Sequence, residues 1–126
     1  MEFGNNYIRF FKDKGQITSG GSAYEISSPY ATSELFDIKF AQSADVMYLC
    51  HPNHDVRKLS RTGHTSWTLA TVSFTGSPSP AISGADNRPS CVSFFEQRLV
   101  FANTNNNPQT LFFSKSGDYE NMTTGT

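Results

Sequence analysis

The sequence predicts an all-β protein made of antiparallel strands, and three observations lead to this prediction. Runs of four to six apolar or β-branched residues alternate with clusters of Pro, Asn, Asp and Gly, as in strands joined by turns. Ser, Thr, Asn and Gly are abundant, whereas strong helix formers are scarce. One strand-like stretch, residues 45–67, has a counterpart 54 positions later, which indicates a repeated β-unit.

The repeat is clearest in its first copy. An apolar run at 46–50 is followed by a polar loop at 51–55, a second run at 56–59 and the single tryptophan, Trp67. In the counterpart, an Asn- and Pro-containing loop at 104–108 takes the place of the polar loop. The alignment matches Val46 with Val100, Leu59 with Phe113 and Gly63 with Gly117.

The N-terminal part, residues 1–30, is expected to hold a hairpin and one further strand. Residues 7–11 and 16–18 are strand-like and are separated by a short turn that contains Gly15. Residues 23–27 have alternating apolar side chains and predict a short third strand.

Residues 31–74 are expected to form the first four-stranded unit. Residues 32–36 carry an N-cap candidate and one helical turn, which is too short to be stable without tertiary support. Strands are predicted at 38–41, in the two apolar runs of the repeat, and at 68–74, where side chains of two kinds alternate.

Residues 75–90 are expected to join the two units, because they are rich in Ser, Pro and Gly and show no periodicity. Residues 91–126 predict a second unit with strands at 92–95, 99–102 and 109–113. No residues remain for a fourth strand, so this second unit is expected to be incomplete.

Four-stranded units that recur every ~40–50 residues are typical of β-propeller blades, which bury their faces against neighbouring blades. About two blades are predicted, so we expect an incomplete propeller with exposed apolar faces unless copies associate. The expected packing residues are large apolar side chains: Phe40, Val46, Tyr48, Leu59, Trp67, Phe94, Phe101 and Phe113. Gly63 and Gly117 are expected at turns, with Gly63 free to adopt a positive φ.

The charge of the chain argues against nucleic-acid binding. Its 126 residues carry a net charge of −1, with a pI near 6.3, whereas phosphate contacts need clustered Lys and Arg. The densest cluster, Arg57, Lys58 and Arg61, lies on a predicted strand where Arg57 and Lys58 point to opposite faces. We interpret it as a solvated strand surface. No apolar run approaches the ~18 residues of a membrane span, so neither a signal peptide nor membrane insertion is predicted.

Enzymatic activity is not predicted, and neither catalytic nor cofactor-binding residues are expected. The sequence has no G-x-S-x-G, no H-E-x-x-H and no phosphate-binding glycine loop. Cys50 and Cys91 lack C-x-x-C spacing and are expected to be reduced and partly buried.

One alternative is a metal site. His51, His54 and Asp55, with His64 nearby, offer imidazole and carboxylate groups of the kind that bind zinc. The counterpart loop at 104–108 has no such ligands. A polar loop between two strands is therefore the preferred interpretation, and no metal residues are predicted.

A second alternative is a carbohydrate-binding module that presents Trp67, Tyr119 and the Asn-rich loops. The spacing Ser60-x-x-Gly63-x-x-x-Trp67 is near that of the Asp-box hairpin turn, in which an aromatic ring packs behind the turn. Here the Asp is missing and the spacing before Gly63 is one residue short. Turn or core packing of Trp67 is therefore preferred to a sugar platform.

Four long strings follow one another along the chain: SPYATSELFDIKFAQSADVMYLCHPNH, VRKLSRTGHTSWTL, CVSFFEQRLVFANT and LFFSKSGDYENMTTGT. In this order they resemble the mid-region of phage tail proteins of the tail tubular protein B (tail nozzle) type, from short-tailed phages and prophages. The resemblance covers about Phe3 to Thr126. Proteins of that family are several times longer, so the resemblance implies a central fragment.

The resemblance also implies a role. Proteins of this family have a propeller-like fold, and several copies form a ring below the portal, through which DNA leaves the particle. It therefore implies a structural protein of the virion tail, assembled in the cytoplasm of the bacterial host. The implied partners are further copies or neighbouring tail and portal proteins, with DNA that passes without tight binding. The family supplies no catalytic residues, and no small-molecule substrate is implied.

Overall fold

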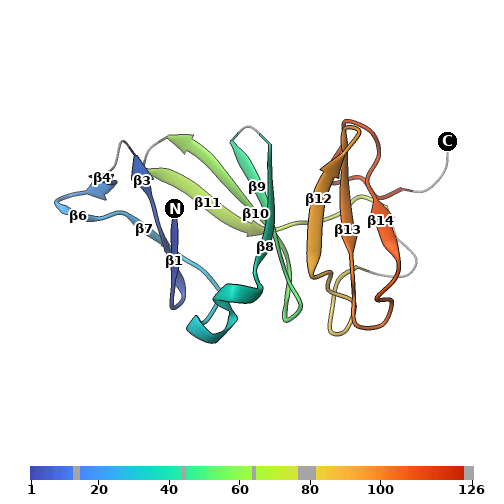
Figure 1. The fold of residues 1–126 in the computed structure, drawn as a ribbon. Coiled ribbons are helices and arrows are strands. Elements are labelled where there is room, and N and C mark those ends of the chain that lie inside the picture. Colours follow the sequence, from blue (N-terminus) through green and yellow to red (C-terminus); the bar gives the residue numbers. More distant parts are fainter. Residues whose placement is uncertain (13–14, 44, 64, 77–81, 124–126) are drawn as a thin grey trace.

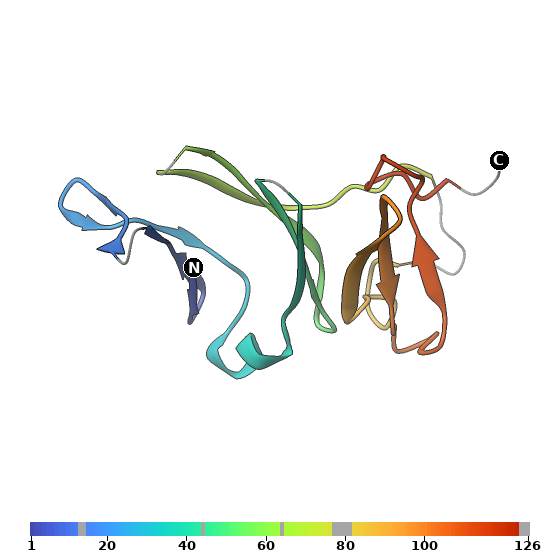
Figure 2. The same cartoon turned by 45° about the horizontal axis from the view of Figure 1, so that its top comes forward.

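The computed structural model describes residues 1–12, 15–43, 45–63, 65–76 and 82–123. Over these residues the chain is mostly antiparallel β-structure with almost no helix, so the all-β prediction is confirmed. Three sheets follow one another through the molecule, as both ribbon views show (Figures 1 and 2). The described residues form no closed barrel or propeller.

The N-terminal sheet has the strand order β1-β2-β7. Its strands are β1 (Glu2–Gly4), β2 (Tyr7–Arg9) and β7 (Glu25–Ser27). Two small ribbons lie between β2 and β7 in the sequence: β3 (Phe11–Lys12) with β4 (Gly15–Gln16), and β5 (Thr18–Ser19) with β6 (Ser22–Ala23). Of the predicted hairpin only the part nearest the turn is present, as the β3–β4 ribbon, because Tyr7–Arg9 pairs with β1 and β7 instead; the turn residues 13–14 lie outside the described residues.

A short 3-10 helix, η1 (Thr32–Asp37), connects the N-terminal sheet to the next one. It is the single helical turn that the sequence predicts. Its N-cap is Ala31, whose backbone N–H donates to Glu34 Oε1 at 3.0 Å. The side chain of Glu34 thus satisfies a backbone donor that the first turn leaves free.

The central sheet is a four-stranded antiparallel meander with the order β11-β10-β9-β8. Its strands are β8 (Lys39–Ser43), β9 (Val46–His51), β10 (His54–Gly63) and β11 (Ser66–Thr71). The polar loop expected at 51–55 shrinks to a two-residue turn, because His51 and His54 pair directly. The fourth strand ends at Thr71, earlier than predicted.

The C-terminal sheet has the order β12-β13-β14. Its strands are β12 (Cys91–Phe95), β13 (Arg98–Ala102) and β14 (Leu111–Phe113). Glu96 and Gln97 form the tight turn between β12 and β13, and both have positive φ, of 47° and 62°. Two positive φ values in succession match the twist of a two-residue hairpin.

Two apolar clusters hold the three sheets together, one on each face of the central sheet. Along β9, Met47 and Leu49 belong to the cluster shared with the N-terminal sheet, whereas Tyr48 and Cys50 belong to the cluster shared with the C-terminal sheet. Alternate side chains of a strand point to opposite faces, so the continuous apolar run of β9 is explained by burial on both. The predicted stacking of two sheets is present, and the N-terminal sheet adds a third layer.

The predicted offset of 54 residues between the repeats is wrong. The pair that flanks the first turn is Ser43 with Val46, and the equivalent pair in the C-terminal sheet is Phe95 with Arg98, 52 positions later. The loop between β13 and β14 is longer than the turn between β9 and β10, so no single offset aligns all strands. The predicted alignment of Val46 with Val100 used one offset for strands whose true offsets differ.

The predicted packing residues divide into three groups. Tyr48, Leu59 and Phe101 are buried. Three others are partly buried and pack against the two clusters: Val46, Trp67 and Phe94. Phe40 and Phe113 are 61% and 46% exposed, so these two side chains are not buried within the chain.

The turn glycines also differ. Gly117 has a φ of 75° in the turn between Lys115 and Asp118, as expected of a turn glycine. Gly63 lies at the end of β10, where it pairs with Ser66 beside the turn to β11, and it does not use the positive φ that glycine permits.

Candidate functional site

The outward face of the C-terminal sheet carries apolar side chains that no other described layer covers. Phe95, Leu111 and Phe113 are 59%, 58% and 46% exposed. The register places Phe113 opposite Val100, so these two side chains share a face. Phe112 points to the other face and is buried in the cluster shared with the central sheet. We name Phe95, Val100, Leu111 and Phe113 the terminal face.

The other end of the stack is polar. On the N-terminal sheet, the Arg9 guanidinium lies 4.5 Å from the centre of the Tyr7 ring, and Arg9 Nε donates to Glu25 Oε2 at 2.9 Å. These side chains alternate with Ile8 and Ile26, which face the central sheet. The two ends of the stack therefore differ in chemistry, and the terminal face is the apolar end.

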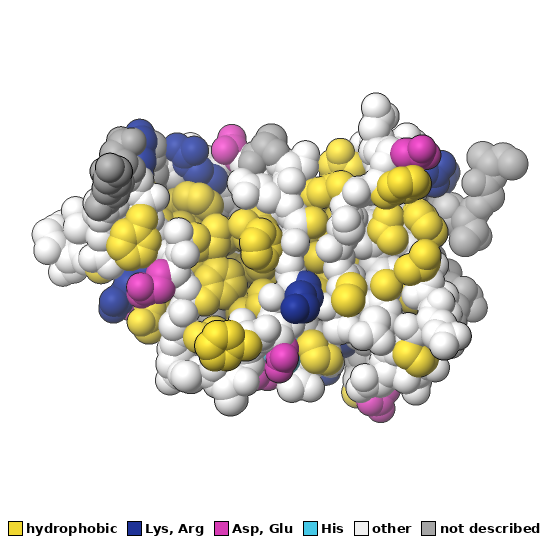
Figure 3. Space-filling model, viewed as in Figure 1, with side chains coloured by type: hydrophobic (Ala, Val, Ile, Leu, Met, Phe, Trp, Pro, Cys, Tyr) yellow, Lys and Arg dark blue, Asp and Glu magenta, His cyan; other side chains and the backbone are white. Residues whose placement is uncertain are grey.

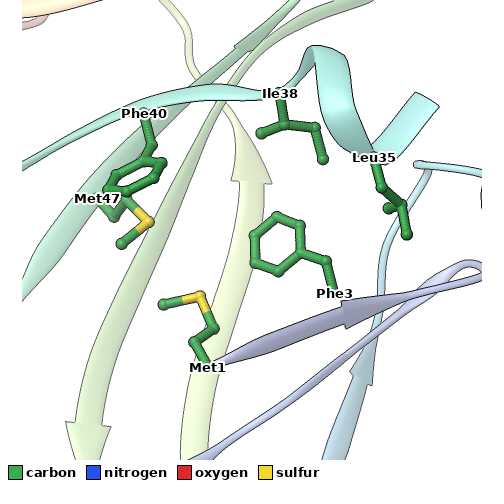
Figure 4. A pocket seen from close by; sticks show the side chains of 6 residues that line it. All are labelled: Met1, Phe3, Leu35, Ile38, Phe40 and Met47. Atoms are coloured by element: carbon green, nitrogen blue, oxygen red, sulfur yellow. The ribbon is translucent and has the colours of Figure 1, made fainter.

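An apolar groove lies between the N-terminal and central sheets. It has a volume of about 300 Å³ and is lined by six side chains from β1, η1, β8, β9 and the residues next to them: Met1, Phe3, Leu35, Ile38, Phe40 and Met47. Figure 4 shows these six side chains directed toward a common space. In the space-filling view, apolar side chains gather between β1 and β8 (Figure 3). We name this feature the β1–β8 groove.

A polar cluster joins η1 to the turn between β9 and β10. His54 Nε2 donates to Glu34 Oε1 at 3.0 Å, and Asn53 Nδ2 donates to Glu34 Oε2 at 3.3 Å. The hydrogen bonds from His54, from the Ala31 N–H and from Asn53 lower the pKa of Glu34 to about 2. His51, which is 1% exposed, lies beside them, and burial lowers the pKa of its ring.

The structure changes the set of residues that could bind a metal. Glu34, His51 and His54 offer ligand atoms within 4.8 Å of one another. Asp55 is not among them, because its Oδ1 accepts hydrogen bonds from the Gly84 N–H and from Arg88 Nε, both at 2.9 Å. His64 lies outside the described residues. Glu34 was missed because it is brought in from η1 by the tertiary fold.

The hydrogen bonding of His51 argues for a structural role of this cluster. Its Nδ1 accepts the backbone N–H of Asn53 at 3.0 Å, so the neutral ring carries its proton on Nε2. A metal ion at Nε2 would move that proton to Nδ1 and break the contact with Asn53. We therefore interpret the cluster as a polar joint that fixes η1 to the β9–β10 turn.

Trp67 is engaged in packing. Its ring stacks on Phe10 with centroids 4.0 Å apart and an interplanar angle of 16°, and its backbone N–H donates to the Tyr24 hydroxyl at 3.2 Å. Phe10 therefore covers one face of the indole, and the Arg61 guanidinium carbon lies 5.9 Å from the centre of the indole ring. Tyr119 is likewise engaged in packing: the centres of its ring and of the Phe94 ring are 5.0 Å apart, at the edge of the core.

The Asn-rich loop bonds to a neighbouring segment of the chain. Asn105 Nδ2 donates to Asp86 Oδ1 at 3.2 Å, and Asn106 Nδ2 donates to Asn87 Oδ1 at 3.0 Å. Backbone N–H groups add to this, because Asn106 donates to the Asp86 carbonyl at 2.9 Å. These amides hold two loops together. The hydrogen bonds within the chain therefore explain the Asn-rich loop without a bound ligand.

The three basic residues on β10 do not form one patch. Lys58 Nζ donates to Glu120 Oε2 at 2.7 Å on the side of the C-terminal sheet. Arg57 points to the opposite face and donates from Nη1 to Thr71 Oγ1 at 3.0 Å. Arg61 Nη1 lies 3.7 Å from Asp45 Oδ1. The predicted division of Arg57 and Lys58 between two faces agrees with these contacts.

The two cysteines differ in exposure. Both are free, Cys50 being buried and Cys91 exposed. Burial raises the pKa of the Cys50 thiol. The expectation of reduced thiols agrees with the structure, whereas partial burial describes neither residue.

Comparisons with protein-family models and with curated proteins found no match to this chain. The described residues include no helix with the length and apolar character that crossing a bilayer requires. The candidate functional features are therefore those of the structure itself: the terminal face, the β1–β8 groove and the polar cluster at Glu34.

Proposed function

We propose that this protein is a structural assembly protein of the phage tail-nozzle type, whose sheets are blade-like units of a larger β-propeller-like ring. Its place would be the virion tail, with assembly in the cytoplasm of the bacterial host. The sequence resemblance supports this proposal. The order of the three sheets is compatible with it, because each successive sheet packs its face against the previous one.

The terminal face is the observation that carries the proposal. Phe95, Leu111 and Phe113 expose large apolar areas on a sheet whose other face is buried. Several exposed large apolar side chains on one sheet face favour association with another protein surface. The partner that we propose is a further copy of the chain, whose own terminal face packs against this one, so that two stacks of sheets join at their apolar ends.

The charge distribution suits a wall along which DNA slides. The net charge is −1, and on β10 both Lys58 and Arg61 lie within ion-pair distance of a carboxylate. Tight binding to DNA needs several Lys or Arg side chains that neutralise phosphates and so displace the counterions condensed on the DNA. Filter binding with duplex DNA at low salt tests this part of the proposal: retention at micromolar protein would contradict a wall that does not hold DNA.

Sedimentation velocity over a range of protein concentrations tests the assembly itself. We expect the sedimentation coefficient of the wild-type protein to rise with concentration. Phe113→Ser should weaken this rise, because it replaces an exposed apolar ring of the terminal face with a hydroxyl group. Phe36→Ser is the matched control, since Phe36 is 94% exposed on η1 and does not belong to that face. A wild-type protein that sediments as a monomer throughout would contradict the proposal.

The carbohydrate-binding alternative has no comparable support. It needs an open aromatic platform, and Phe10 stacks on Trp67 at 4.0 Å. A glycan hit that is lost in Trp67→Ala but kept in Phe113→Ser would favour that alternative over assembly.

A further inference from the structure

The β1–β8 groove exists because two stacked sheets have unequal numbers of strands. The N-terminal sheet has three strands and the central sheet has four. β7 lies near β11 at one side of this interface, and β1 lies near η1 at the other. Nothing among the described strands lies beyond β1 to cover β8, so one strand position over the central sheet is open.

The exposure of Phe40 follows from this open position. Phe40 pairs with Leu49 and therefore points to the face of the central sheet that the N-terminal sheet covers. Leu49 is fully buried there, whereas Phe40, on the edge strand, is 61% exposed. Phe40 thus points to the same face as the buried Leu49, but no described strand of the N-terminal sheet covers it at that position.

The groove continues an interface that the chain already makes. Met47 belongs to the buried cluster between the two sheets, and Phe3, Leu35 and Ile38 pack against that cluster. The same four side chains line the groove together with Met1 and Phe40. A segment that fills the groove would therefore extend this packing by one strand.

The unpaired backbone edge of β1 also favours an added strand at the groove. β1 pairs with β2 along one edge, and its other edge pairs with no strand of the described residues. An edge strand presents unpaired N–H and C=O groups, which form hydrogen bonds with an added strand. The free edge of β1 and the apolar floor from β8 and β9 lie at the same side of the molecule (Figures 1 and 4).

We propose that the β1–β8 groove is a strand-acceptor site for an extended peptide segment of a partner protein. The segment pairs with the free edge of β1 and becomes the fourth strand of the N-terminal sheet. In this segment apolar and polar side chains alternate, so that side chains on the same face are about 7 Å apart. The apolar set enters the groove over Phe40 and Met47, and the polar set faces solvent. This site is distinct from the terminal face and does not depend on the identity of the chain as a tail protein.

Fluorescence anisotropy of the full chain with a labelled peptide tests the site. The probe is a short fluorescein-labelled peptide in which Val or Leu alternates with Thr between terminal lysines. We expect saturable binding. The control peptide has Pro in place of the central Val, which removes a backbone N–H and prevents strand pairing. It should bind at least tenfold more weakly.

Two variants locate the binding on the protein. Phe40→Ser should weaken peptide binding several-fold, and because Phe40 is 61% exposed the fold should be retained, as circular dichroism can verify. Phe36→Ser, on the same side but outside the groove lining, should bind as the wild type does. In NMR spectra, the amide protons of β1 that point to its free edge, and not those already bonded to β2, should become protected from exchange when the peptide is bound.

Three results would overturn the proposal: no anisotropy change with the alternating peptide, equal binding of the proline peptide, or unchanged binding to Phe40→Ser. The outcome is separable from that of the assembly test. Phe113→Ser should leave peptide binding unchanged, and Phe40→Ser should leave the concentration dependence of sedimentation unchanged.

Discussion

The rings of Tyr48 and Phe94 meet edge to face, with centroids 6.3 Å apart, between the central and C-terminal sheets. A polar contact lies beside this pair, because the Tyr48 hydroxyl donates to Glu120 Oε2 at 3.1 Å. Lys58 Nζ donates to the same oxygen at 2.7 Å. Burial, together with the charge of Glu120, raises the pKa of Tyr48, so the hydroxyl remains a donor. The interface between the two sheets thus combines an aromatic contact with a shared carboxylate.

The alternation along β14 predicts losses of stability of very different size for two neighbouring phenylalanines. Phe112 is buried between the sheets, whereas Phe113 is 46% exposed on the terminal face. Phe112→Ala should lower the free energy of unfolding by about 3 kcal/mol or more, because it leaves a cavity in the core. Phe113→Ala should lower it by less than about 1 kcal/mol. Urea denaturation at low protein concentration measures both, and equal losses would contradict the register of β14.

The Phe10–Trp67 stack predicts a fluorescence change. Trp67 is the single tryptophan, so its emission reports on this contact. Phe10 is 2% exposed, and Phe10→Ala should move the emission maximum to longer wavelength because water reaches the indole. It should also destabilise the chain by about 3 kcal/mol. Phe95→Ala, at a 59% exposed position on β12 of the C-terminal sheet, is the control and should leave the emission unchanged.

Asp55 predicts a loss of stability in acid. Burial alone would raise the pKa of Asp55, but the hydrogen bonds from the Gly84 N–H and from Arg88 outweigh it, and the pKa is lowered in the folded chain. The resulting stabilisation is complete above the unfolded-state pKa, near ~3.9, and disappears as the pH falls through the lower folded-state value. It should amount to about 1 kcal/mol or less, because Asp55 and Arg88 are 33% and 27% exposed.

Unfolding of the wild-type protein and of Asp55→Asn, measured from neutral pH down to pH ~2, tests this prediction. The difference in unfolding free energy between the two should be constant near neutral pH and should shrink in acid. A difference that grows as the pH falls would contradict the sign that we assign to Asp55.

The two thiols should react at very different rates. Cys91 is exposed, whereas Cys50 is buried and its pKa is raised, so little thiolate forms. A thiol reagent at neutral pH should modify one cysteine per native chain and both in denaturant. Cys91→Ser should remove the fast reaction, and a fast reaction that persists in this variant would show that Cys50 is accessible.

Local patterns were sufficient to predict the strands of the central and C-terminal sheets. The apolar run at 46–50 and the turn at 96–97 both have strong local signals, and both lie where expected. The faces of a uniformly apolar strand were harder to assign. The segment Leu111–Phe113 has no alternation of its own, and only its pairing with β13 shows that Phe112 points inward.

The features missed from the sequence depend on contacts between distant segments. Glu34 bonds to His54 across 20 positions, and no local pattern relates η1 to that turn. β2 pairs with β7 across the two small ribbons, so the N-terminal part forms a sheet where a hairpin and a strand were expected. The exposure of Phe40 likewise depends on the number of strands in the neighbouring sheet.

Native-state hydrogen exchange, followed residue by residue, tests most directly whether the central sheet is covered on both faces. β9 lies between two other strands of its sheet and between two apolar clusters. Its amide protons should therefore exchange only through global unfolding, more slowly than those of the edge strands β1 and β14. Exchange of β9 as rapid as that of β14 would contradict the stacked arrangement on which both proposals depend.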